Sequence, residues 1–168
     1  MNSLVAFLSP GGLAIVIALV VMALETWLVR PDPVGFITSL RQPSWALPRA
    51  VVFTIPVFFY GIATYAAAAA IRAGDPGRAA LVAVVAVLVG NALSNHLMFR
   101  RRRIDWASWF SIAVVLVAAV ATHLVFALDR VAGALMGLVV LSLIYDVAWL
   151  AALRRLNPEH TGRSTPQT

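Results

Sequence analysis

Residues 106–128 read WASWFSIAVVLVAAVATHLVFAL, a stretch that contains no Asp, Glu, Lys or Arg. A helix of this length, at a rise of about 1.5 Å per residue, crosses the roughly 30 Å hydrocarbon core of a bilayer. Four other stretches are apolar over a similar length: Gly12–Val29, Val51–Ile71, Ala79–Phe99 and Val131–Leu153. The sequence therefore predicts an all-α integral membrane protein, a bundle of five transmembrane helices.

The composition supports this class of protein and excludes others. Of the 168 residues, 61% are hydrophobic and 12% are charged, so lipid must solvate much of the surface. We expect one transmembrane domain over residues 1–157 and a polar, disordered tail over residues 158–168. The absence of cysteine excludes disulfides, thiolate metal sites and cysteine nucleophiles. Without a Walker loop, an HExxH motif or a Ser-His-Asp arrangement, we do not expect an enzyme.

The arginines are distributed unevenly between the two sides of the predicted bundle. Three lie on the N-terminal side, at Arg72, Arg78 and Arg130. Ten lie on the other side, at Arg30, Arg41, Arg49, Arg100, Arg101, Arg102, Arg103, Arg154, Arg155 and Arg163. The positive-inside rule then predicts an outer N-terminus and a cytoplasmic C-terminus, in what we take to be a bacterial inner membrane. Since arginines at helix ends meet lipid phosphates, the net charge of +6 does not indicate a nucleic-acid partner.

The segment Pro31–Pro48 is too long for a tight turn between the first two spans, and prolines bound it at both ends. Within it, apolar residues recur at near-helical spacing, at Val34, Phe36, Ile37 and Leu40. This pattern predicts a short helix that lies over the mouth of the bundle as a cap. Pro48 suits the first turn of the second span.

Polar side chains within the spans are costly in lipid and mark candidate functional sites. In the third span Asn91, Ser94, Asn95 and Met98 share one helical face, which must look inward. Glu25, Tyr60 and Asp146 fall at similar depths, so these groups should meet beneath the cap. Two interpretations remain open, a ligand pocket or a hydrogen-bond network that holds the helices together. For Glu25, snorkelling towards Arg30 is a further alternative.

Two other features have both structural and functional interpretations. Gly133 and Gly137 form a GxxxG spacing, which suits either helix packing within the chain or a homodimer interface. His96 and His123 lie near opposite ends of different spans, so we expect hydrogen-bonded histidines and not a joint metal site.

The segment from Phe36 to Tyr60 resembles the TspO/MBR family, the tryptophan-rich sensory proteins related to the mitochondrial translocator protein. The residues that carry the resemblance keep the family's spacing without a gap: Phe36-Ile37, Leu40, Gln42-Pro43, Ser44-Trp45, Leu47-Pro48-Arg49 and Tyr60. Further matches occur at Asn91, Asp129, Ala132, Gly133, Leu156 and Asn157. Three of the family's tryptophans are replaced, by Pro56, Ser94 and Ser142.

The resemblance implies a five-helix membrane protein that binds a hydrophobic or amphipathic small molecule and acts in transport or sensing. The family's ligands are porphyrins and haem-like tetrapyrroles, with cholesterol in mitochondrial members, and such a molecule would be a ligand and not a built-in cofactor. We expect a more polar pocket than the family's, in which Phe36 and Trp45 stack on the ligand while Tyr60 and Asn91 hydrogen-bond to it. The expected ligand-binding residues are Phe36, Trp45, Pro48, Tyr60, Asn91, Ser94, Asn95, Ser142, Asp146 and Trp149. Alternative functions are a small proton-coupled transporter, suggested by Glu25 and Asp146, and a structural subunit of a larger membrane complex.

Overall fold

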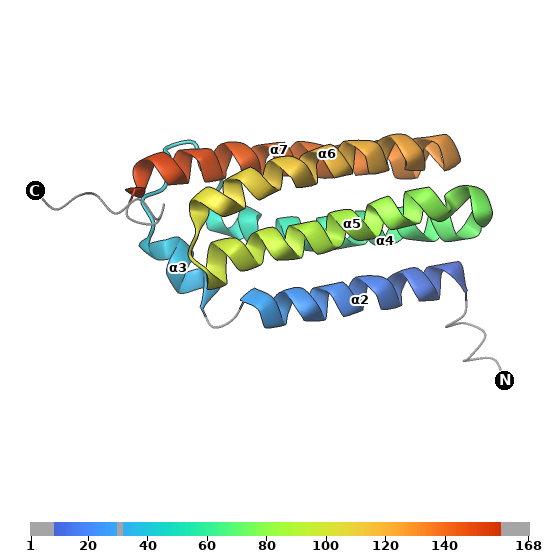
Figure 1. Cartoon of the computed structure of the whole chain (residues 1–168), viewed down its shortest axis with the longest axis horizontal. Coiled ribbons are helices and arrows are strands. Elements are labelled where there is room, and N and C mark those ends of the chain that lie inside the picture. Colours follow the sequence, from blue (N-terminus) through green and yellow to red (C-terminus); the bar gives the residue numbers. More distant parts are fainter. Residues whose placement is uncertain (1–8, 30–31, 159–168) are drawn as a thin grey trace, which may run out of the picture.

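The computed structural model describes residues 9–29 and 32–158, which form a bundle of helices (Figure 1). Its elements are α2 (Pro10–Val29), α3 (Pro33–Ser39), α4 (Arg49–Arg72), the 3-10 turn η1 (Asp75–Gly77), α5 (Arg78–Asn95), the π-helical turn η2 (His96–Arg100), α6 (Ile104–Leu128) and α7 (Arg130–Leu156). Five helical segments are long and apolar enough to cross a membrane, and the described residues contain no strand. The prediction of an all-α bundle with five transmembrane helices is confirmed. The predicted disordered tail lies, after Pro158, outside the described residues.

The long helices run antiparallel to their neighbours in sequence. α5 lies in the middle of the bundle, where it contacts α2, α4 and α6, and α7 packs along α6 and also against α4. Helix α3 lies across one end of the bundle, which we call the capped end (Figure 1). The first described helix, α2, begins at the opposite end, and α7 finishes at the capped end. The short cap helix that the proline-bounded segment predicted is therefore present, as α3.

Small residues bring the helices close together at the end opposite the cap. The run Ala66–Ala70 of α4 is buried along its whole length. Gly77, in the turn between α4 and α5, has so little space that a Cβ atom there would lie 1.9 Å from the carbonyl oxygen of Ala70. Such small residues let helices approach in membranes, where packing contributes much of the stability.

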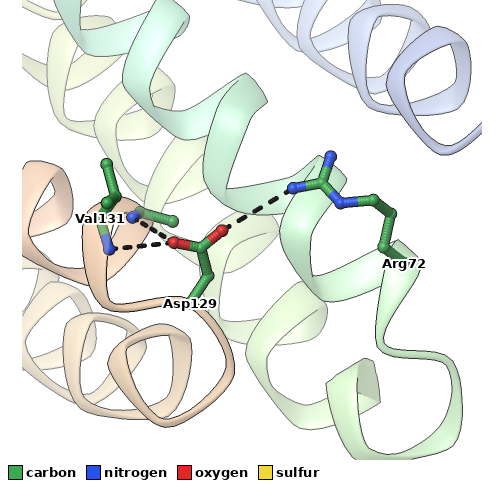
Figure 2. A network of polar contacts seen from close by, with 4 residues as sticks. Arg72, Asp129 and Val131 are labelled. Atoms are coloured by element: carbon green, nitrogen blue, oxygen red, sulfur yellow. Dashed lines mark hydrogen bonds and ion pairs between the residues drawn. The ribbon is translucent and has the colours of Figure 1, made fainter.

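The same end is fastened by the side chain of Asp129, which lies in the turn between α6 and α7. Its carboxylate accepts hydrogen bonds from the backbone amides of Val131 and Ala132, at 2.9 and 3.0 Å, and so caps the N-terminus of α7. Figure 2 shows the same carboxylate facing Arg72, at the end of α4, over an N···O distance of 3.9 Å. The exposed ion pair contributes little energy, whereas the cap satisfies two amides that begin a helix.

The two glycines of the GxxxG pair have different surroundings. A Cβ atom at Gly133 would lie 2.4 Å from the Cα atom of Phe126, so the backbones of α6 and α7 are too close there for any side chain. At Gly137 a Cβ atom would meet nothing within 4 Å. Gly133 therefore serves packing within the chain, which is one of the two alternatives that the sequence left open.

This difference leads to a test with a matched control. We expect Gly133→Ala to lower the apparent melting temperature of the detergent-solubilised protein by several degrees, because the added methyl group pushes α7 away from α6. Gly137→Ala should leave stability unchanged or raise it slightly, by up to about 1 kcal/mol, since alanine favours helix more than glycine does. Equal effects of the two substitutions would contradict this account of Gly133.

Candidate ligand-binding site

A cavity of about 230 Å³ lies beneath α3, among the capped ends of the long helices. Its wall is mainly apolar, with aromatic rings contributed by Phe59, Phe99 and Trp149. The polar side chains in the wall come from four helices: Glu25 of α2, Asn91, Ser94 and Asn95 of α5, Ser111 of α6, and Ser142 and Asp146 of α7. An apolar cavity with a few converging polar groups is the usual form of a small-molecule site.

The polar face of α5 lines this cavity. Asn91, Ser94, Asn95 and Met98 all border it, as their spacing along one helical face requires. Ser94 is buried, and its hydroxyl lies 2.6 Å from that of Ser111 on α6. This contact satisfies both hydroxyls and joins α5 to α6 at the cavity wall.

The end of α5 widens into the π-helical turn η2, which turns Met98 and Phe99 towards the cavity. His96, the first residue of η2, donates a hydrogen bond from Nδ1 to the carbonyl oxygen of Leu28, at 3.0 Å. This histidine therefore fixes η2 to the end of α2. No group of three metal-ligating side chains occurs in the part of the chain that the structure describes.

Glu25 joins three helices through its carboxylate. The Tyr60 hydroxyl of α4 donates to Oε2, and the Asn95 amide of α5 donates to Oε1 at 2.5 Å. The side chain of Glu25 thus points into the bundle and is held by two neutral donors. These two hydrogen bonds reduce the free-energy cost of holding a carboxylate away from water.

A second hollow opens beside the cavity, between α2 and α4. This groove has a volume of about 510 Å³ and is more open than the cavity. Glu25, Val29, Pro33 and Pro56 border both spaces, so only a thin wall separates them. Tyr60 lines the groove, not the cavity.

Helix α7 holds the cap in place through three side chains. Asn157 accepts from the backbone amide of Arg41 at 2.8 Å and donates to the carbonyl oxygen of the same residue at 3.1 Å. The Trp149 indole donates to the Gln42 side chain at 3.0 Å, and the Tyr145 hydroxyl accepts from the backbone amide of Leu47 at 2.9 Å. The non-helical backbone between α3 and α4 is thus tied to the bundle at three points.

The structure divides the ten residues that the sequence singled out into two groups. Six border the cavity: Asn91, Ser94, Asn95, Ser142, Asp146 and Trp149. The other four do not border it. Tyr60 lines the groove, and Pro48 lines a hollow between the cap and α7. The ring of Phe36 packs on that of Phe99, and the ring of Trp45 packs on that of Tyr145. In this arrangement Phe36 and Trp45 support the cap. They are not part of the cavity wall, where their expected stacking on a ligand would occur.

Several residues of the cavity wall were not among the expected ligand-binding residues. Glu25 is predicted to lie beneath the cap, in a ligand pocket or a hydrogen-bond network, but is not among the ten, and the sequence analysis does not single out Ser111, Phe59 or Phe99. Ser111 was detectable as one of the few polar residues in a span without charges. No sequence signal identifies Phe59 or Phe99, because other phenylalanines in the spans have the same character.

Comparison with protein families gives one match. The model of the TspO/MBR family matches residues 14–155. The chain belongs to the TspO/MBR family. A comparison with curated proteins finds no match. The positions at which the resemblance to TspO/MBR proteins expects tryptophan, now Pro56, Ser94 and Ser142, all border the cavity, so these replacements alter its wall directly.

The Glu25 network allows a test with a paired control on one helix. Tyr60→Phe removes a donor to the Glu25 carboxylate, and we expect it to cost about 1–2 kcal/mol, more than an average interhelical hydrogen bond in a membrane. The apparent melting temperature in detergent should fall accordingly. Tyr65→Phe, one and a half turns along α4, should change nothing, because the ring keeps its contact with Arg72 and the Tyr65 hydroxyl makes no hydrogen bond to the residues that the structure describes. The two variants behaving alike would argue against the network.

The fastening of the cap can be tested by proteolysis. Asn157→Ala leaves the amide and carbonyl of Arg41 without their partner, at a cost of about 1–3 kcal/mol, so the cap should open more often. We expect trypsin to cleave the variant faster than the wild type after Arg41. Both proteins are digested in lipid nanodiscs, and the cleavage is measured by mass spectrometry. Thr38→Ala provides the control, since the Thr38 hydroxyl donates only within α3, to Gly35. Cleavage at the wild-type rate in Asn157→Ala would contradict the role of Asn157.

Proposed function

We propose that this member of the TspO/MBR family binds a hydrophobic or amphipathic small molecule beneath α3, in a transport or sensory role. The observation that carries the proposal is the capped cavity, in which polar groups from four helices converge within an apolar wall. A network built only to hold helices together needs no such space. Glu25 and Asn95 do stabilise the bundle, yet they also border the cavity, so both interpretations of the polar residues apply to them.

The size of the site bears on the class of ligand. Sites for drug-sized ligands have volumes of roughly 300–1,000 Å³, and the cavity of about 230 Å³ falls below this range. A compact amphipathic molecule fits the cavity alone. A tetrapyrrole or sterol-like ligand, the class that the family implies, would extend from the cavity past Glu25 and Pro56 into the groove between α2 and α4.

We further propose that the capped end faces the cytoplasm of a bacterial cell, with the protein in the inner membrane. The arginines of η2 and of the last turn of α7 gather at this end. Two exposed tryptophans there carry arginines over their rings, Trp106 with Arg103 and Trp109 with Arg154. Such pairs suit the boundary between hydrocarbon and lipid headgroups.

Cavity filling provides the test of ligand binding. Ser142→Leu adds apolar bulk to the cavity wall, and we expect it to weaken binding at least about tenfold, roughly 1.4 kcal/mol. The probes are phenylbutanol, a compact amphipathic alcohol, and protoporphyrin dimethyl ester, a neutral tetrapyrrole. Binding is measured by calorimetry in lipid nanodiscs, after subtraction of the heat with empty nanodiscs.

The control adds the same side chain to the same helix. Ala148 is exposed on α7 and does not border the cavity, so Ala148→Leu should bind both probes as the wild type does. Asn91→Ala should also weaken binding, because it removes a hydrogen-bonding group from the wall. If neither probe binds saturably, or if Ser142→Leu binds as tightly as Ala148→Leu, the proposed site is wrong.

A further inference from the structure

The charged groups that border the cavity all have the same sign. Two carboxyl groups face it, those of Glu25 and Asp146. The other polar groups of its wall are amides, hydroxyls and the Trp149 indole, which carry no charge. No arginine or histidine borders the cavity among the residues that the structure describes.

The two carboxyl groups differ in how they are held. Glu25 is satisfied by Tyr60 and Asn95, both neutral donors. The side chain of Asp146 makes no hydrogen bond and no ion pair within residues 9–29 and 32–158, and it lies partly buried in the cavity wall. A carboxylate that is removed from water requires a cation or several donors. The described residues provide neither to Asp146, so an occupant of the cavity can.

The other residues of the cavity wall indicate which kind of cation would suit the site. Aromatic rings of Phe59, Phe99 and Trp149 surround the space, together with aliphatic side chains. Ammonium groups are stabilised over aromatic faces, and apolar walls accept the hydrocarbon part of a ligand. A metal ion, in contrast, requires more ligating groups than two carboxylates, and no group of three metal-ligating side chains is present in the described part of the chain.

We propose that the ligand of this cavity is an amphipathic organic amine, whose ammonium group pairs with Asp146 while its apolar part lies against the aromatic wall. This inference rests on the proposed function and specifies its ligand class. Asp146 gains a positive charge that the described residues do not supply, and Glu25 adds a second negative charge to the same space. An anionic ligand, such as a tetrapyrrole with free carboxylates, would meet two carboxyl groups and no compensating arginine.

A matched series of probes tests the charge preference. Phenylbutylamine, phenylbutanol and phenylbutyrate have nearly the same size and differ in charge at one end, positive, neutral and negative. We expect the wild-type protein in lipid nanodiscs to bind the amine at least about tenfold more tightly than the alcohol, and the carboxylate least. Nanodiscs of uncharged lipid, with empty nanodiscs as the blank, remove the contribution of the bilayer.

Two variants assign the preference to Asp146. Asp146→Asn keeps the size of the side chain and removes its charge, so the affinity for the amine should fall to within about threefold of the affinity for the alcohol in the same variant. Asp105→Asn is the control, because Asp105 pairs with Arg103 at the start of α6 and does not border the cavity. This variant should keep the full preference of the wild type.

The outcomes separate this inference from the proposed function. If the alcohol binds and Ser142→Leu weakens it, but the amine binds no better than the alcohol, the charge preference is wrong and the site stands. A preference for the amine that survives in Asp146→Asn also overturns the inference. If no probe of the series and no porphyrin ester binds saturably, both the site and its ligand class are wrong.

Discussion

The hydrogen bonds from α7 and from Asn157, directly after it, to the segment between α3 and α4 are the interactions on which the cap over the cavity depends. Non-helical backbone near the hydrocarbon core must find its partners within the protein, since lipid supplies none. Asn157 supplies them to the backbone of Arg41 and Tyr145 to that of Leu47, while Trp149 donates to the Gln42 side chain. These contacts act together with the burial of Phe36 and Leu40 against the capped ends of the long helices to hold the segment above the cavity. Trp149 also borders the cavity, so one side chain serves both the cap and the site.

The polar side chains within the bundle are subject to the same constraint, because lipid offers them no hydrogen-bond partners. Glu25 is tolerated because Tyr60 and Asn95 reach it from two other helices, which makes the carboxylate a fixed part of the wall. Asp146, on the opposite side of the cavity wall from α2, has no such support within the described residues. A polar network and a ligand site are therefore not exclusive alternatives here. The satisfied groups hold the helices, and the unsatisfied one remains available to an occupant.

The sequence predicts the architecture well because the architecture depends on local properties of the chain, such as the length of apolar stretches and the positions of prolines. Apolar length gives the five helices, and the prolines around the cap give its ends. The inward face of α5 is predictable because polar residues stand out at helical spacing. On α6 nearly every residue is apolar, so the pattern cannot tell which side chains turn inward, and it does not identify Ser111. Phe59 of α4 is missed because other phenylalanines in the spans have the same character. The directions of Phe36 and Trp45 depend on Phe99 and Tyr145, which are far away in sequence.

The three positions at which the resemblance expects tryptophan lie in the cavity wall of a chain that keeps the TspO/MBR fold. Pro56, Ser94 and Ser142 border the cavity from three different helices, so each replacement removes aromatic surface from the wall without removing a contact that holds the cap. At one of these positions Ser94 hydrogen-bonds to Ser111, and all three positions share the cavity wall with Asp146. Fold and ligand class are thus set by different residues. Membership of the family therefore accounts for the bundle and its cap, while the proposed preference for an amine depends on the charge of the cavity wall, which the family pattern does not describe.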